Sequence, residues 1–177
     1  QSRSSAASDV YKRQVLTIKD YKKSLDLAKC LYDSGIVNLD IRLRTQQSKK
    51  AIELIKNSKF KFNIGIGTVL SLEDLYFVKS LGIKYAYSPN TDVKILNNAN
   101  KLDIQFIPGI SNIDNVISAI KCNCKYLKYY PAEKSGGVSN LDLIIAKSKI
   151  KNLKFIAMGG ITSINIKPYL MHKNIIG

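Results

Sequence analysis

The sequence has little of what metal centres and disulfide frameworks need. Its 177 residues include three cysteines and one histidine. Cys30, Cys122 and Cys124 form an odd set without the paired spacing of a zinc site, and a chain of this size that builds a core does not depend on disulfides. This cysteine usage fits a reducing cytoplasm. His172, the single histidine, falls in a late predicted helix and is interpreted as a surface residue.

Long apolar runs are also missing. No run reaches the ~18 residues that span a bilayer, and the N-terminus has no hydrophobic signal segment. We therefore expect a soluble cytoplasmic protein with no membrane partner. With 45% hydrophobic residues, the chain is long enough to bury one substantial core and too short for two ordinary domains.

Acidic residues are few, with 13 against 28 basic residues, so the formal net charge is +15. Binding to nucleic acid would require the basic residues to gather on one face. The lysines instead recur singly or in pairs on predicted helix surfaces, as in Lys22-Lys23 and Lys49-Lys50. We expect no nucleic-acid partner, and nucleic-acid binding stays a third-ranked alternative.

Residues 1–14 differ in composition from the rest and have no apolar periodicity, so we interpret them as a non-native or disordered tail. They resemble translated adapter sequence, and the natural N-terminus is expected to be missing. Residues 15–177 are expected to form a single barrel domain.

From Val15 onward, short β-branched runs alternate with helical patterns, which is typical of βα units around a parallel sheet. The predicted strands are Val15–Ile18, Asn38–Leu43, Phe62–Gly67, Tyr85–Ser88, Ile104–Pro108, Tyr126–Tyr130, Lys154–Met158 and Asn174–Gly177. Eight strands predict an α/β fold, a compact (β/α)8 TIM barrel. Because such barrels typically take about 250 residues, we expect truncation at both ends and an incomplete eighth βα unit.

The competing architecture is an open doubly wound sheet, which has the same alternation of strands and helices. That fold usually carries a glycine-rich turn after its first strand. No glycine follows Ile18 directly, so the barrel is favoured.

Lys128 lies within the predicted strand Tyr126–Tyr130, where alternation places Leu127 on the opposite face, toward the helices. Lys128 then points into the barrel, where burial of an uncompensated ammonium lowers its pKa. A partly neutral lysine is a nucleophile toward a ketone. The alternative is a lysine of an edge strand that lies in solvent, as most lysines do.

Other polar and glycine residues cluster at predicted strand ends. Asp40, Arg42 and Arg44 share a face if their strand stays regular, and supply a proton carrier and a clamp for a carboxylate. The alternative is an ion-paired strand end. Thr68 follows two glycines and can hydrogen-bond a carboxylate. Gly159-Gly160, with a contribution from Gly136-Gly137, could bind phosphate on backbone N–H groups, although both pairs are more often turns.

Together these stretches resemble the 2-keto-3-deoxy-6-phosphogluconate and 4-hydroxy-2-oxoglutarate aldolases over nearly the whole chain from Val15. The motifs that carry the resemblance are Leu39-Asp40-Ile41-Arg42-Leu43-Arg44-Thr45, Ile64-Gly65-Ile66-Gly67-Thr68-Val69, Tyr87-Ser88-Pro89, Ile107-Pro108-Gly109-Ile110-Ser111, Leu127-Lys128-Tyr129-Tyr130-Pro131-Ala132-Glu133, Gly136-Gly137-Val138 and Gly159-Gly160-Ile161.

The resemblance implies a class I aldolase, a carbon–carbon lyase of the Entner-Doudoroff pathway that works as a homotrimer. It implies Lys128 as the Schiff-base lysine and Asp40 as the general acid/base. The expected substrate-binding residues are Arg44 and Thr68 for the pyruvate carboxylate, Pro89 as pocket wall, and Gly159 and Gly160 for phosphate. No metal or other cofactor is expected, because an iminium stabilises the carbanion.

The sequence also departs from the family pattern. Asp40 stands where the family has glutamate, Thr17 where many relatives have arginine, Arg42 where they have a small or neutral residue, and Met158 where they have threonine. A serine-bearing loop that helps to hold phosphate would lie beyond Gly177. These departures support an alternative function, a non-catalytic or altered barrel that binds a phosphorylated keto acid.

Overall fold

The computed structural model describes residues 13–177, and the chain divides into two compact units, one ending at Ala86 and the other beginning at Tyr87. The predicted tail lies outside the described residues up to position 12, whereas Gln14 already belongs to the first strand. A single domain over residues 15–177 stays a prediction. No helix in the described part of the chain has the length and apolar character needed to cross a bilayer.

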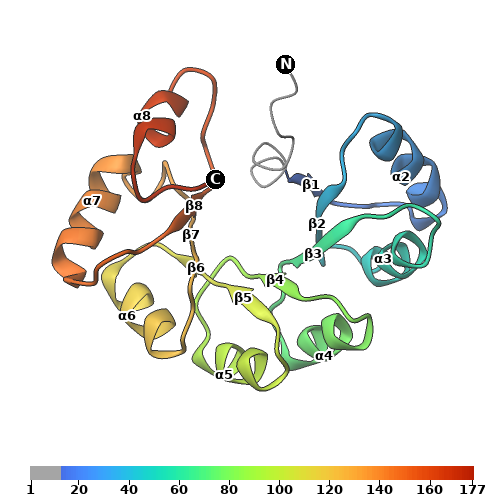
Figure 1. Ribbon diagram of the computed structural model, residues 1–177, viewed down its shortest axis with the longest axis horizontal. Helices are drawn as coiled ribbons and strands as arrows, with labels where there is room; N and C mark the ends of the chain where they lie inside the picture. Colours follow the sequence, from blue (N-terminus) through green and yellow to red (C-terminus); the bar gives the residue numbers. More distant parts are fainter. Residues whose placement is uncertain (1–12) are drawn as a thin grey trace, which may run out of the picture. The chain divides into compact units, whose positions relative to one another are not determined.

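The first unit alternates strands and helices around a parallel sheet (Figure 1). Its elements are β1 (Gln14–Leu16), the 3₁₀ helix η1 (Tyr21–Lys23), α2 (Ser24–Asp33), β2 (Asn38–Arg42), α3 (Ser48–Lys56), β3 (Asn63–Gly67), α4 (Leu72–Ser80) and β4 (Tyr85–Tyr87). β2 pairs with β1 on one side and with β3 on the other, in a register that sets Asp40 beside Val15 and Gly65. β2 is therefore an internal strand of this sheet.

Alternate residues of β2 and β3 form the core of the first unit. Leu39, Ile41 and Ile66 are fully buried, as are Ile52 and Ile55 of α3. Burying one such side chain contributes roughly 1.5–3 kcal/mol. The strands thereby bury one set of side chains against the helices and turn the intervening residues, Asp40 among them, to the other face.

The second unit repeats the pattern (Figure 1). Its elements are α5 (Val93–Lys101), β5 (Gln105–Ile107), β6 (Gly109–Ile110), α6 (Ile113–Lys121), β7 (Leu127–Tyr129), α7 (Gly137–Ser148), β8 (Phe155–Ala157) and α8 (Ile166–Met171). β6, β7 and β8 are parallel neighbours, and their register sets Lys128 between Gly109 and Ile156. β7 is the central strand of the three.

Short polar side chains begin several helices by accepting hydrogen bonds from the first free N–H groups. Ser71 accepts from the N–H of Asp74 at 3.0 Å at the start of α4. Asp92 accepts from the N–H of Lys94 at 2.8 Å at the start of α5. These caps fix where each loop after a strand turns into a helix, and hence the loops that carry the candidate site.

Two predicted strands differ from the observed ones. The strand predicted over Ile104–Pro108 is interrupted at Pro108, which has no N–H to donate to a ladder, so that β5 and β6 lie on either side of it. The predicted strand Asn174–Gly177 is reduced to a single bridge, in which Ile175 pairs with Phe155. Even so, Phe155 N–H donates to Asn174 O and Ala157 N–H to Gly177 O, both at 2.8 Å, so this segment does run beside β8.

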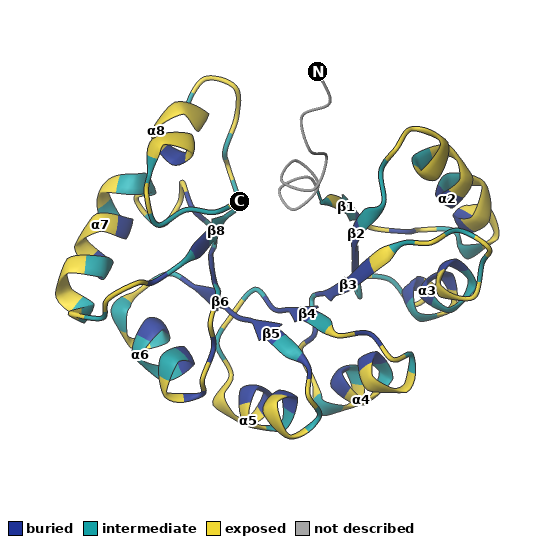
Figure 2. Ribbon diagram, in the orientation of Figure 1, coloured by how far each residue is buried: buried dark blue, intermediate teal, exposed yellow. Residues whose placement is uncertain are grey.

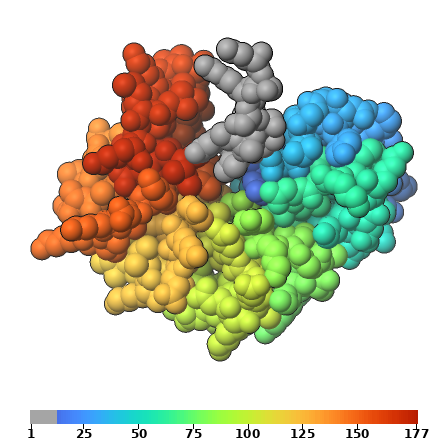
Figure 3. Space-filling model, viewed as in Figure 1, coloured from blue at the N-terminus to red at the C-terminus, as the bar shows by residue number. Residues whose placement is uncertain are grey.

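Burial follows the layers of each unit (Figure 2), because the helices bury the face that lies on the strands and expose the opposite face. α8 and the loop before it are the least covered part of the second unit. Ile164, Leu170 and Met171 are 93%, 75% and 75% exposed, and in Figure 3 the C-terminal residues form part of the molecular surface.

Candidate active site

Lys128 occupies the middle of β7 and is only 7% exposed. Its backbone N–H donates to Pro108 O at 2.9 Å, and its ammonium lies 5.0 Å from the centre of the Tyr130 ring. Leu127 and Tyr129 are fully buried on the opposite face, as alternation predicts. The alternative of a solvent-exposed lysine on an edge strand is wrong, because β7 is paired on both sides.

Pro89 is packed against the strand next to Lys128. A Cβ atom on Gly109 would lie 2.1 Å from Pro89 O, so only a glycine lets the two backbones approach this closely. The Thr91 hydroxyl donates to Gly109 O at 2.8 Å and secures the same contact. Because Gly109 is also the register partner of Lys128, this loop is held beside the lysine strand, consistent with a pocket wall at Pro89.

The two glycines after β8 are packed on the segment that follows Lys128. Both have positive φ angles, +101° at Gly159 and +81° at Gly160, a region that favours glycine. Glu133 N–H donates to Gly159 O at 3.1 Å, and Ala132 N–H donates to Met158 O at 2.8 Å. Within residues 13–177 the N–H groups of Gly159 and Gly160 donate no hydrogen bond, which is the arrangement an anion site requires.

A side-chain link that no sequence pattern predicts lies behind this turn. The Tyr169 hydroxyl of α8 donates to Glu133 Oε1, and a Cβ atom on Gly160 would lie 2.8 Å from the Glu133 Cβ. Burial and the neighbouring carboxylate raise the pKa of Tyr169, so its proton is retained for this bond. The partners are 36 residues apart, so no local pattern could have identified them.

Gly136 and Gly137 serve mainly to start α7. Gly136 is the N-cap residue in a left-handed conformation, and Gly137 is the first helical residue. The carbonyl of Gly137 accepts from the buried Tyr129 hydroxyl at 3.0 Å. The interpretation of this pair as a turn therefore fits the structure better than a direct contribution to phosphate binding.

In the first unit, Asp40 and Arg42 lie on the face of β2 that is turned away from α3. Asp40 is 4% exposed, and Arg42 is half-buried. A Cβ atom on Gly67 of β3 would lie 2.4 Å from Asp40 Oδ1 and 3.1 Å from Arg42 Cγ. Both side chains therefore lean over Gly67, and a glycine at this position gives the carboxylate its room.

The shared face of Asp40, Arg42 and Arg44 depends on a regular strand, and the strand stops before Arg44. β2 ends at Arg42, and the Arg44 N–H donates to Arg42 O at 3.0 Å, which closes a tight three-residue turn. Arg44 is exposed beyond that turn. Two-residue spacing applies only while the chain stays extended, so the place of the Arg44 side chain stays a prediction.

Thr68 directly follows β3 and adopts φ +62°, a left-handed conformation that is rare for a β-branched residue. It is half-buried, and its neighbour Val69 is fully buried. Asp40, Arg44 and Thr68 thus lie on or directly after β2 and β3 in the first unit, whereas Lys128, Pro89 and the two glycines belong to the second unit.

His172 is less exposed than the sequence suggested, with 9% of its side chain accessible. Its Nε2 lies 3.0 Å from Asp142 Oδ1, and its Nδ1 accepts from the Asn174 N–H at 3.1 Å. This histidine orients the segment after α8. In the part of the chain that is described, no three His, Cys, Asp or Glu side chains are grouped to hold a metal ion.

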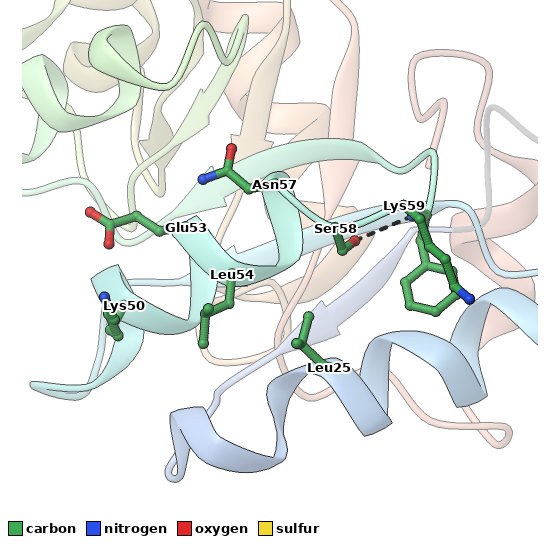
Figure 4. Close-up of a pocket in the computed structure, with 8 residues that line it drawn as sticks. Leu25, Lys50, Glu53, Leu54, Asn57, Ser58 and Lys59 are labelled. Carbon is green, nitrogen blue, oxygen red and sulfur yellow. Dashed lines mark hydrogen bonds between the residues drawn. The ribbon is translucent and has the colours of Figure 1, made fainter.

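A shallow groove of about 550 Å³ lies between α2 and the end of α3 (Figure 4). Leu25 of α2 faces Leu54 and the segment Asn57–Phe60 across it. None of the predicted site residues lines this groove, so it is separate from the candidate active site.

Comparison with known proteins identifies a family and relatives that match nearly the whole chain. The family model described as KDPG and KHG aldolase matches residues 10–177. The 2-dehydro-3-deoxy-phosphogluconate aldolase of Pseudoalteromonas atlantica is 35% identical over 91% of this chain and 74% of its own length. The KHG/KDPG aldolase of Escherichia coli K12 is 31% identical over 92% of this chain and 75% of its own length.

A solved structure extends the likeness to three dimensions. The KDPG aldolase of Legionella pneumophila, with pyruvate captured as a covalent carbinolamine, has a TM-score of 0.83 and 31% identity over 92% of this chain and 78% of its own. This likeness confirms the predicted fold class, a truncated α/β barrel, over the doubly wound sheet. The chain belongs to the KDPG and KHG aldolase family.

Proposed function

We propose that this protein is a class I aldolase that forms a Schiff base through Lys128. It cleaves 2-keto-3-deoxy-6-phosphogluconate to pyruvate and glyceraldehyde 3-phosphate, or 4-hydroxy-2-oxoglutarate to pyruvate and glyoxylate, or both. Family membership supports the reaction class. The observation that carries the assignment of the lysine is that Lys128 is 7% exposed within an internal strand.

The proposed reaction begins when the neutral Lys128 amine attacks the C2 ketone of the substrate. Loss of water from the carbinolamine gives an iminium, which accepts electrons as the C3–C4 bond breaks. Asp40 removes the proton of the C4 hydroxyl, so that an aldehyde leaves and an enamine of pyruvate remains. Protonation at C3 and hydrolysis of the iminium release pyruvate and restore the amine.

The remaining residues are proposed to bind the substrate. Arg44 and Thr68 hold the C1 carboxylate, and Pro89 forms a wall of the pocket. Gly159 and Gly160 bind the phosphate of the larger substrate through N–H groups that donate no other hydrogen bond within residues 13–177. A cytoplasmic homotrimer acting in the Entner-Doudoroff pathway completes the proposal. Light scattering tests the trimer, and a mass equal to one chain would contradict it.

Borohydride reduction in the presence of pyruvate tests the covalent step. We expect a reduced pyruvate adduct, located by peptide mass analysis on Lys128. Lys125 and Lys134 are exposed lysines near the same strand and serve as internal controls. An adduct on either of them with Lys128 unmodified would contradict the assignment. Complete absence of an adduct would favour the altered, non-catalytic barrel.

A further inference from the structure

Arg42 is an unusual basic residue in this chain. Most of the lysines lie on exposed surfaces, whereas Arg42 is half-buried at the end of β2. Among residues 13–177, no carboxylate forms an ion pair with its guanidinium. An arginine at the carboxyl end of a strand, with no carboxylate paired to it among these residues, is available to bind an anion supplied from outside the chain.

The direction of the Arg42 side chain indicates where that anion binds. Its Cγ and the Asp40 carboxylate both lie against Gly67, so the two side chains leave β2 on the same face. Along a strand, two residues span about 7 Å. The Arg42 side chain therefore leaves β2 on the same face as the proposed proton carrier, one pleat closer to the carboxyl end of the strand.

We propose that Arg42 binds the terminal carboxylate of a dicarboxylic keto acid, and so selects 4-hydroxy-2-oxoglutarate as the preferred substrate. This rests on the proposed function, in which Asp40 acts at the C4 hydroxyl. In that substrate the second carboxylate is attached directly to C4, within reach of a side chain beside Asp40. The planar fork of an arginine matches a carboxylate with two parallel hydrogen bonds.

Two keto acids that lack the C4 hydroxyl, and so cannot undergo retro-aldol cleavage, isolate this interaction. 2-Oxoglutarate and 2-oxopentanoate have the same chain length and the same C1 carboxylate, and differ in whether C5 is a carboxylate or a methyl group. Calorimetric titration should show that the parent protein binds the dicarboxylate at least tenfold more tightly. Arg42→Gln should remove about 10- to 100-fold of affinity for 2-oxoglutarate, the range of hydrogen bonds to a charged group, and change that for 2-oxopentanoate much less.

Arg44→Gln is the matched control, because Arg44 is proposed to hold the C1 carboxylate that both acids share. It should weaken both acids by similar factors. Should Arg42→Gln not fold, Arg42→Lys decides the question: it keeps the charge, loses the fork and should still lower the preference severalfold. A parent without preference for the dicarboxylate, or a preference that the substitutions at Arg42 leave unchanged, overturns the proposal.

Turnover measurements show whether Arg42 binds the carboxylate of one substrate or the phosphate of the other. If Arg42→Gln lowered kcat/KM only for 2-keto-3-deoxy-6-phosphogluconate, Arg42 would belong to a phosphate site and the proposal would be overturned. Formation of the pyruvate adduct tests the proposed aldolase function separately from the role of Arg42. A parent that forms no adduct contradicts the proposed function and this assignment with it, whereas a parent that forms it without any dicarboxylate preference contradicts only the role of Arg42.

Discussion

The strands that carry Lys128 and Asp40 are both paired on two sides, and they differ in how the chain continues after them. The backbone around Lys128 is hydrogen-bonded through and beyond β7: Tyr130 N–H donates to Ile110 O, and Ala132 N–H to Met158 O. The backbone after Asp40 leaves its ladder within a few residues, in the turn at Arg42. Asp40 itself is paired on both sides within β2, and its carboxylate is in addition packed over Gly67.

The surroundings of Lys128 and Asp40 predict which substitutions would displace each side chain. A nucleophile placed by a ladder of backbone bonds changes position only when the strand itself moves. A proton carrier placed over one glycine moves when a single carbon atom is added. Substitutions near Lys128 should therefore affect stability together with activity, whereas substitutions near Asp40 should affect the rate with little effect on the fold.

Removal of the amine should have the largest effect. Lys128→Met keeps an unbranched side chain in β7 and should lower turnover by on the order of 10⁴-fold or more, because no other group forms the iminium. Borohydride should then trap no pyruvate. Lys125→Met, at an exposed position, should leave turnover and trapping unchanged. Substantial turnover by Lys128→Met would remove the covalent role from β7.

Changes at Asp40 should separate proton transfer from adduct formation. Asp40→Asn should lower retro-aldol turnover by roughly 10²–10⁴-fold, the usual range for a general acid/base, while the pyruvate adduct stays detectable. Asp40→Glu should hold or raise the rate, because it restores the reach of the family's glutamate. Parent-like turnover by Asp40→Asn would demote Asp40 to a structural partner in β2.

Alanine substitutions at Gly67 and Gly109 should compare the surroundings of Asp40 and Lys128 directly. The Cβ of Gly67→Ala would displace the Asp40 carboxylate, and a displacement of about 1 Å can cost on the order of 10²-fold in turnover. The Cβ of Gly109→Ala would meet the backbone of Pro89 and should lower the free energy of unfolding by about 1–3 kcal/mol.

Kinetics and denaturant unfolding of both glycine variants provide the measurement. We expect Gly67→Ala to lose rate with little loss of stability, and Gly109→Ala to lose stability. The reverse pattern would contradict the contrast between a glycine that faces a side chain and a glycine that faces a backbone.

The smallest expected effect is a difference in alkaline stability. Burial raises the pKa of Cys124 to about 12, against about 8.5 in an unfolded chain, and also raises the pKa values of Tyr129 and Tyr169. All three lie in the second unit. Between these values the unfolded chain loses protons that the folded chain keeps, so stability falls as pH rises above about 8.5.

Cys124→Ser should reduce that fall by about 1–2 kcal/mol at pH 10.5, measured as the change in free energy of unfolding between pH 8 and pH 10.5. Cys30→Ser is the control, because Cys30 is an exposed thiol on α2 of the first unit. An equal effect of both serine substitutions would exclude burial of Cys124 as the cause.

Periodicity predicted the parts of the fold in which the chain stays regular. The strand around Lys128, and the face on which its side chain lies, follow from alternation, because β7 has no bulge or turn. The same rule does not extend to Arg44, since the turn after β2 depends on one local hydrogen bond. Pro108 could have been identified as an interruption, because it lacks the N–H that a ladder needs.

Contacts between distant segments left no such signal. The fit of Asp40 over Gly67 depends on the register of two strands, and the bond from Tyr169 to Glu133 joins a helix to a turn 36 residues away. Single-sequence patterns describe neighbours along the chain. The residues that determine how closely two backbones approach, such as Gly67 and Gly109, are identified only when the partner strand is known.

The left-handed conformation of Thr68 implies a trade-off between stability and activity. A β-branched residue at φ +62° costs roughly 1–2 kcal/mol that a glycine would not incur. Thr68→Gly should therefore make the protein harder to unfold while removing the hydroxyl proposed to hold the C1 carboxylate. A selection for thermostability alone would favour that substitution, whereas a selection for growth on the substrate would remove it.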